Sequence, residues 1–194
     1  KPKKIISPSI KLVSPKFNIE RFFVDEPIED KINELFQNSY PIDKDLILIF
    51  PEGITNIGEI NQLENDFDNI SNQLTDKSKI ILGITLDDGE KIFNSLAVFS
   101  KDFKIEDKYN KNKLVPFGEF LPLEKFLSKF GLKKITHGYK SFSSSTERNI
   151  LSVGEFSFLP LICYEIIFSG ALTKNADKYD FILNISEDGW FGDS

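Results

Sequence analysis

The stretch Phe158-Leu159-Pro160-Leu161-Ile162-Cys163-Tyr164-Glu165 decides the fold, because it joins a short apolar strand to a turn that carries the chain's single cysteine. An uninterrupted apolar run of this length is typical of a strand buried on both faces. Cys163 ends this strand just before a helix expected over residues 165–174, and the positive end of a helix dipole favours the thiolate. A thiolate there is suited to act as a nucleophile. A single cysteine in an apolar run is usually a small core residue, so Cys163 alone does not decide the function.

Apolar strands and helical segments alternate along most of the chain, which predicts an α/β layered domain. Strands are expected over residues 10–13, 46–50, 79–85, 92–100, 150–153, 156–162 and 181–185. Helices are expected over 25–40 and 57–74, where apolar residues recur at helical spacing. The segment 101–149 is rich in Lys, Phe and Ser and is expected to be less regular.

The composition restricts the class of protein. With 194 residues, 40% of them hydrophobic, the chain is expected to form one globular domain. A net charge of −6 argues against a nucleic-acid binder, and one cysteine excludes an internal disulfide. No apolar run reaches the roughly 20 residues of a membrane-spanning helix, and the lysine-rich start is not a signal peptide. We therefore expect a soluble or peripheral chain.

Two further segments carry candidate catalytic groups. Glu52 follows the apolar run 46–50, where burial of an unpaired carboxylate would be costly. Beside a thiol it would serve as a general base, although a turn acid or a helix cap is an equally good interpretation. The segment 109–119 places Lys111 and Lys113 before an apolar turn and Glu119. A fixed ammonium there would stabilise an oxyanion, whereas most such lysines only form a solvated face.

The order of a glutamate after one strand, then a lysine, then a cysteine after a later strand resembles the nitrilase (carbon–nitrogen hydrolase) superfamily. Within it, LVPFGE over residues 114–119 and ICYE over 162–165 look like the apolipoprotein N-acyltransferase family. Further matches are Pro51-Glu52, Asn94-Ser95, Asn184-Ile185-Ser186 and Asp188-Gly189-Trp190-Phe191-Gly192. The resemblance implies a nitrilase-like αββα sandwich over residues 9–194, truncated at its C-terminal end, after a linker or tail of residues 1–8.

The resemblance also implies a catalytic triad. Cys163 would be the nucleophile, Glu52 the base that activates it, and Lys111 the ammonium that stabilises the tetrahedral intermediates. We prefer Lys111 to Lys113 because it lies eight residues before Glu119, as the family lysine does. Glu119 would be the family's additional essential glutamate.

Other residues are expected to support this site. Tyr164 and Glu165 match the residues after the nucleophile that help to build the site. Trp190 and Phe191 would lie in the loop after the last predicted strand and contact the substrate, or simply pack that loop over the core. A dyad of Cys163 with the single histidine, His137, is disfavoured because His137 does not follow a predicted strand.

The activity implied is an acyl transfer in two steps. Cys163 would take an acyl chain from a phospholipid donor, and the thioester would pass it to the N-terminal diacylglyceryl-cysteine of a diacylated apolipoprotein. No metal, organic cofactor or nucleic acid is expected to take part. The family works at the bacterial inner membrane, with its catalytic domain on the periplasmic face.

A membrane contact is also predicted from the residues themselves. Leu123, Phe126, Leu127 and Phe130 recur at helical spacing, with lysines between and after them. A basic amphipathic helix of this kind suits a membrane surface, and it equally suits packing on the protein's own core.

The chain departs from the family pattern in several places. Family members carry a bundle of transmembrane helices before this domain and further elements after it, which are absent from this sequence. Glu187 stands where the family usually has Asn, and its charge is expected to raise the pKa of Cys163. A soluble nitrilase-type amidase and an inactive fragment of a split acyltransferase gene therefore remain as alternatives.

Overall fold

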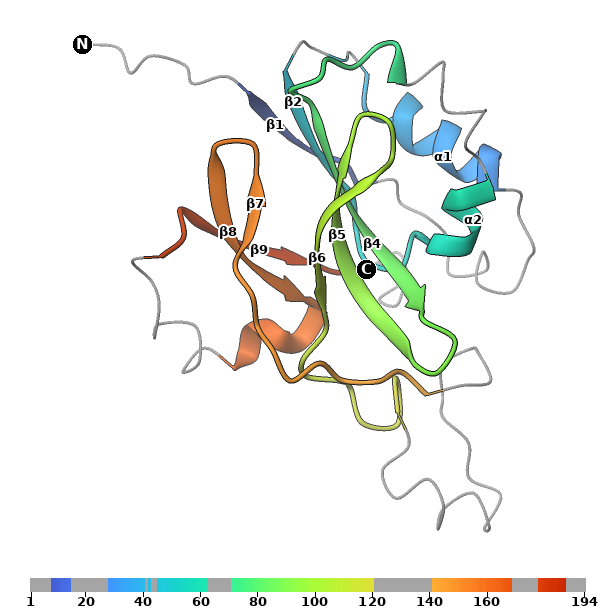
Figure 1. Cartoon of the computed structure of the whole chain (residues 1–194), viewed down its shortest axis with the longest axis vertical. Helices are drawn as coiled ribbons and strands as arrows, with labels where there is room; N and C mark the ends of the chain where they lie inside the picture. Colours follow the sequence, from blue (N-terminus) through green and yellow to red (C-terminus); the bar gives the residue numbers. More distant parts are fainter. Residues whose placement is uncertain are drawn as a thin grey trace, which may run out of the picture.

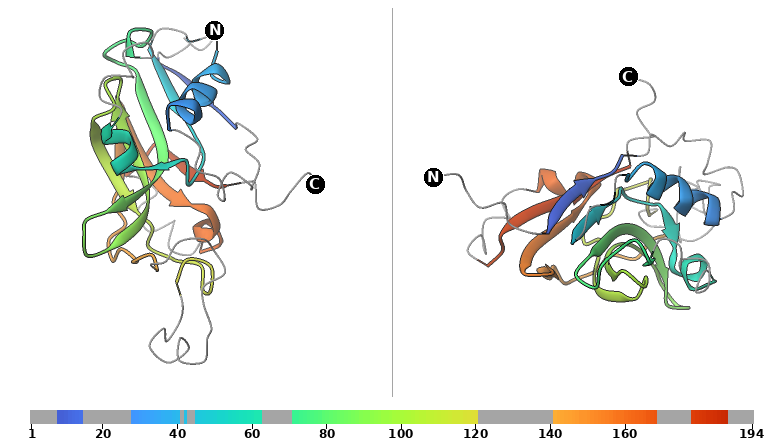
Figure 2. Two further views of the ribbon diagram at one scale, coloured as in Figure 1. Left: turned by 90° about the vertical axis from the view of Figure 1, so that its right-hand side faces the viewer. Right: turned by 90° about the horizontal axis from the view of Figure 1, so that it is seen from above.

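Two β-sheets packed face to face form the centre of the molecule (Figures 1 and 2). The computed structural model describes residues 8–14, 28–40, 42, 45–62, 71–120, 141–168 and 178–187. The larger sheet has the strand order β1-β2-β4-β5-β6, with β3 paired to β4, and the smaller has the order β7-β8-β9. Helices α1 and α2 cover the outer face of the larger sheet (Figure 2).

The larger sheet contains β1 (Ser9–Leu12), β2 (Leu46–Ile49), β3 (Thr55–Asn56), β4 (Lys79–Asp87), β5 (Ile92–Ser100) and β6 (Ile105–Asn110). The strands β1, β2 and β4 pair in parallel, as do β3 and β4, whereas β4, β5 and β6 are antiparallel. The smaller sheet contains β7 (Leu151–Val153), β8 (Phe156–Ile162) and β9 (Phe181–Ile185). Its strand β8 pairs antiparallel with β7 and parallel with β9.

The apolar run at residues 46–50 shows why the layers form. Leu46, Leu48 and Phe50 lie in the core shared with α1 (Ile28–Gln37) and α2 (Ile57–Gln62). Ile47 and Ile49 point the other way, into the core between the two sheets. Since side chains alternate along a strand, only an uninterrupted apolar run can fill both cores.

Most predicted strands are confirmed, and the structure differs from the expectations in three places. The segment 101–149 contains the regular strand β6, whose sequence IEDKYN carries few apolar residues because most of its side chains are not buried. At the start of the helix expected over 165–174, the structure has a five-residue 3₁₀ helix, η3 (Cys163–Ile167), which begins two residues earlier. Residues 169–174 of that expected helix lie outside the described part of the chain. The short strand β3 was also missed.

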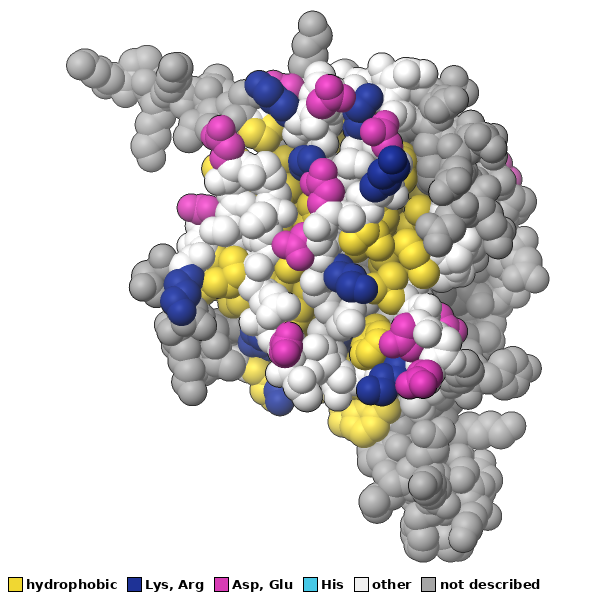
Figure 3. All heavy atoms as spheres, viewed as in Figure 1, with side chains coloured by type: hydrophobic (Ala, Val, Ile, Leu, Met, Phe, Trp, Pro, Cys, Tyr) yellow, Lys and Arg dark blue, Asp and Glu magenta, His cyan; other side chains and the backbone are white. Residues whose placement is uncertain are grey.

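One face of the molecule mixes the two signs of charge. On the face drawn in Figure 3, acidic and basic side chains are interspersed among hydrophobic ones. On that face the described side chains form no broad basic patch. Among the described residues, no helix combines the length and the hydropathy needed to cross a bilayer.

Candidate active site

The turn between β2 and β3 places Glu52 against strand β4. The Gly83 amide donates to the Pro51 carbonyl at 3.1 Å, and the Ile54 amide donates to the Gly83 carbonyl at 2.9 Å. A Cβ atom at Gly83 would lie 2.4 Å from the Glu52 Cα and 2.6 Å from the Pro51 oxygen. Glycine is therefore required at position 83 for the turn that carries Glu52 to approach the strand this closely.

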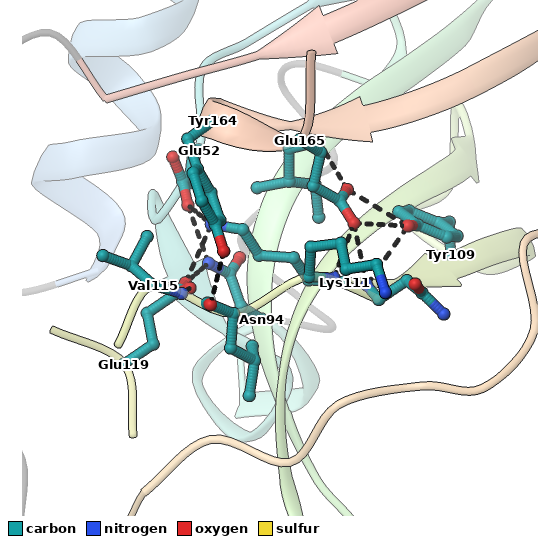
Figure 4. A network of polar contacts seen from close by, with 12 residues as sticks. Glu52, Asn94, Tyr109, Lys111, Val115, Glu119, Tyr164 and Glu165 are labelled. Atoms are coloured by element: carbon teal, nitrogen blue, oxygen red, sulfur yellow. Dashed lines mark hydrogen bonds and ion pairs between the residues drawn. The ribbon is translucent and has the colours of Figure 1, made fainter. Parts of the chain in front are cut away.

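Four side chains from distant parts of the sequence meet beside this turn (Figure 4). Oε1 of Glu52 accepts hydrogen bonds from Asn94 Nδ2 at 2.7 Å and from Lys111 Nζ at 3.2 Å. Oε1 of Glu119 accepts from the same two nitrogens, at 2.6 Å and 2.9 Å. Two acceptors thus alternate with two donors in a closed ring, which we call the Glu52–Lys111 ring.

Burial strengthens the electrostatics of this ring. Lys111 is only 1% exposed, and Glu52, Asn94 and Glu119 are each below 10%. Desolvation alone would lower the pKa of Lys111, but the charges of Glu52 and Glu119 outweigh it and raise that pKa. Lys111 is therefore held as an ammonium ion and not as a free amine.

The loop after β6 fixes the far side of the ring. The second oxygen of Glu119, Oε2, accepts a hydrogen bond from the Val115 amide at 2.8 Å, and the Glu119 amide donates to the Val115 carbonyl at 2.9 Å. Lys113, the alternative lysine, is exposed. The structure thus brings Lys111, not Lys113, together with Glu52 and Glu119.

Cys163 occupies a strained turn at the end of β8. Its φ angle is 54°, in the left-handed region that a non-glycine residue adopts at a cost of about 1–3 kcal/mol. Such a turn lifts the side chain away from the strand it ends, as in the strand-to-helix elbows that carry nucleophiles in α/β-hydrolases. The thiol is half-buried.

The expected thiolate at Cys163 was wrong. Burial, and after it the charge of Glu52, raise the pKa of the thiol, and the opposing effects of Ser186, Lys111 and the Tyr164 amide are smaller. The 3₁₀ helix that begins at Cys163 has only five residues, so its dipole is too weak to offset this rise in the pKa. At neutral pH the resting form is the neutral thiol, so a nucleophilic reaction needs a base to remove the proton.

Glu165 joins the cysteine turn to the lysine loop. Its carboxylate is fully buried and accepts hydrogen bonds from the Ile162, Asn112 and Lys113 amides at 2.9–3.0 Å. The hydroxyl of Tyr109, on β6, donates to it at 2.8 Å, and Arg148 lies 3.6 Å away. Figure 4 shows these contacts as a second group beside the Glu52–Lys111 ring.

The other predicted site residues divide into two groups. Tyr164 lies beside the site, and its hydroxyl donates to the Leu114 carbonyl at 2.7 Å. Burial and then the charge of Glu119 raise its pKa, so it stays a neutral donor. The remaining predicted residues lie outside the described part of the chain: Phe126, Leu127, Phe130, Trp190, Phe191 and the alternative His137.

The sequence patterns missed three residues of the site, Gly83, Tyr109 and Arg148, and did not predict the contacts of Asn94. Asn94 was quoted only as a family match. A buried amide within the apolar strand sequence IFNSLAVFS is the signal that could have drawn attention to it. Within the described part of the chain, no three Cys, His, Asp or Glu side chains are placed to hold a metal ion.

Solved structures with the same arrangement define the class of fold. The chain aligns with a CN-hydrolase superfamily protein from Xanthomonas campestris at a TM-score of 0.56 and 16% identity, over 92% of this chain and 64% of that one. A carbon–nitrogen hydrolase from Helicobacter pylori aligns at 0.54 and 15% identity, over 91% and 59%. The predicted nitrilase-like α/β fold is therefore confirmed.

The sequence comparison identifies the family. The model of the carbon-nitrogen hydrolase family matches residues 47–194, and the chain belongs to that family. A protein of Bradyrhizobium diazoefficiens named apolipoprotein N-acyltransferase is 40% identical over 103 residues, which are 53% of this chain and 19% of that protein. The protein of the same name from Rhizobium rhizogenes is 34% identical over 132 residues, or 64% and 25%. The chain thus spans about a fifth to a quarter of the length of these relatives.

Proposed function

We propose that this chain is a catalytic domain that transfers an acyl chain from a phospholipid to the N-terminal diacylglyceryl-cysteine of an apolipoprotein. The observation that carries the proposal is the buried contact of Glu52 with Lys111, two charges that also act on the thiol of Cys163 in its strained turn. The relatives named apolipoprotein N-acyltransferase support the choice of substrates. Activity at a membrane surface, on the periplasmic face of the bacterial inner membrane, follows from the same proposal.

Each residue takes the role that its ionisation supports. Because the thiol of Cys163 is neutral, Glu52 accepts its proton while the sulfur attacks the carbonyl carbon of the phospholipid ester. The ammonium of Lys111 stabilises the oxyanion of the tetrahedral intermediate, and Glu119 holds that ammonium in place. Protonated Glu52 then gives its proton to the departing lysophospholipid oxygen, and the thioester remains.

The second half of the reaction repeats these transfers. The α-amino group of the acceptor attacks the thioester carbon, Glu52 takes a proton from the nitrogen, and the sulfur leaves and is protonated again. Tyr164 and Glu165 hold the turn and the loop in register. We assign membrane contact to Phe126, Leu127 and Phe130, and substrate contact to Trp190 and Phe191, from the sequence pattern alone.

Intact-mass spectrometry after incubation with phosphatidylethanolamine vesicles tests the proposal. We expect an adduct of one acyl chain on the parent chain, removable by hydroxylamine as a thioester is, and no adduct on Cys163→Ala. Glu52→Gln should slow adduct formation by roughly 100-fold or more, as the loss of a general base does. Hydrolysis of small amides without an adduct would instead indicate an amidase. A folded chain with neither activity would indicate an inactive fragment.

A further inference from the structure

The side chain of Asn94 is the neutral corner of the Glu52–Lys111 ring. It lies on β5, is 8% exposed, and uses both amide hydrogens, one for each carboxylate. Its main chain takes part as well, because the Asn94 carbonyl accepts a hydrogen bond from the Lys111 amide at 2.8 Å. Asn94 therefore contacts all three charged members of the ring.

The charges in the ring explain why a neutral donor is needed. Two carboxylates share one ammonium, and like charges brought this close in a buried site repel each other. Lys111 alone leaves that repulsion partly uncompensated. An amide supplies a second hydrogen bond to each carboxylate and adds no charge, so the carboxylates keep their positions.

The ring also leaves defined atoms open. Both hydrogen bonds to Glu52 end on Oε1, and within the described residues Oε2 of Glu52 accepts none. Two of the three hydrogens of the Lys111 ammonium are used, and no described residue accepts the third. The open oxygen and the open hydrogen are the two groups that a thiol and an oxyanion require.

We propose that Asn94 is a positioning residue. Its hydrogen bond holds Oε1 of Glu52 next to Lys111 and thereby keeps Oε2 of Glu52 directed toward Cys163. The inference rests on the proposed function for its consequence in catalysis, but the placement of Glu52 can be measured without it. When Asn94 is removed, the carboxylate of Glu52 moves away from the thiol, and its effect on the thiol is lost.

Alkylation of the single cysteine by iodoacetamide across a pH series reports this effect, because only Cys163 reacts. The charge of Glu52 raises the pKa of the thiol, so Glu52→Gln should move the alkylation midpoint to lower pH. Asn94→Leu keeps the approximate shape of Asn94, removes both donors, and should move the midpoint in the same direction by a similar amount. The double variant should move it no further, since both changes remove one interaction.

The controls separate positioning from a general loss of structure. Asn184→Leu, at an exposed site on β9, should leave the midpoint unchanged. Asn94→Ser keeps one hydrogen-bond donor at this position, so its alkylation midpoint should lie between those of the parent and Asn94→Leu. This variant allows the test to be made if Asn94→Leu does not fold. Acyl-adduct formation should fall by at least about tenfold in Asn94→Leu.

Two results would overturn the inference. One is a parental midpoint in folded Asn94→Leu or Asn94→Ser, and the other is an additive shift in the double variant. A failure of the proposed function looks different. The midpoints would follow the expected pattern while the parent forms no acyl adduct, and that result supports the placement of Glu52 by Asn94.

Discussion

Replacing Gly83 by alanine should displace the turn that carries Glu52. The added Cβ would lie 2.4 Å from the Glu52 Cα, and ordinary contact begins at 3.4 Å, so the two backbones must separate by 1.0 Å (3.4 − 2.4). All three nearest atoms belong to the backbone, so no side chain can move aside. Gly83 does not have a positive φ, so alanine can adopt its backbone conformation. Any loss of stability would therefore come from the clash.

The expected cost follows from the contacts. Overpacking of this kind costs about 1–3 kcal/mol. The two hydrogen bonds that join Gly83 to Pro51 and Ile54 would lengthen, at about 1 kcal/mol each. We therefore expect Gly83→Ala to lower the free energy of unfolding by roughly 3–5 kcal/mol, measured by urea denaturation. Because Glu52 moves with the turn, the alkylation midpoint of Cys163 should also fall toward that of Glu52→Gln.

Gly58→Ala is the matched control. Gly58 lies in α2, and its nearest neighbour is the end of the Asn56 side chain at 3.2 Å, which needs to shift by only a few tenths of an ångström. Alanine should be neutral there or stabilise the helix by up to about 1 kcal/mol. The reasoning is refuted if Gly83→Ala unfolds within about 0.5 kcal/mol of the parent, the range of ordinary surface substitutions.

Three further predictions concern residues that follow the strands β8 and β9 of the smaller sheet. Ser186→Ala should move alkylation of Cys163 to higher pH, because the hydrogen bond from Ser186 lowers the pKa of the thiol; an unchanged midpoint would exclude that bond. Cys163→Gly should be more stable than Cys163→Ala by about 1 kcal/mol in urea, since only glycine adopts a φ of 54° without strain. The usual order, with alanine the more stable, would contradict the strained turn. Glu165→Gln should cost about 3–5 kcal/mol, because the amide NH₂ would face N–H donors and leave Arg148 unpaired. The exposed Glu155→Gln should change stability by less than about 0.5 kcal/mol.

The elements that the sequence predicts well are those whose apolar residues decide their position. The strands β5 and β9 begin and end where the pattern predicts, and β2 differs by one residue. Each presents apolar side chains to a core on at least one face. In such segments the local pattern and the packed structure contain the same information.

Strand β6 could not be predicted, because its stability comes from its neighbour. Its sequence IEDKYN has one fully buried side chain, Tyr109, and the strand is held by pairing with β5 at the edge of the sheet. The 3₁₀ turn after β8 has a similar cause. Glu165 accepts a hydrogen bond from the Ile162 amide, three residues back, and this closes a tight turn at that point.

The candidate site was predictable only through the family resemblance. The matched motifs drew attention to Glu52, Lys111 and Cys163, whereas the spacing along the chain says nothing of their contacts. Asn94 and Glu52 are 42 residues apart in sequence, and Glu165 and Lys113 are 52 apart. Contacts over such separations depend on the sheet topology, which no local pattern contains.

The site is divided between the two sheets, and this division determines what its chemistry depends on. Glu52 and Lys111 follow strands of the larger sheet, whereas Cys163 follows β8 of the smaller one. Among the described residues, the apolar core between the sheets, the Glu165 carboxylate and the hydrogen bond from Tyr164 to Leu114 hold the sulfur in place relative to the ammonium. A displacement of about 1 Å between reacting groups can cost 100-fold in rate. A substitution in the inter-sheet core that moves one sheet by that much should therefore slow the proposed acyl transfer about 100-fold while each half of the site keeps its own hydrogen bonds.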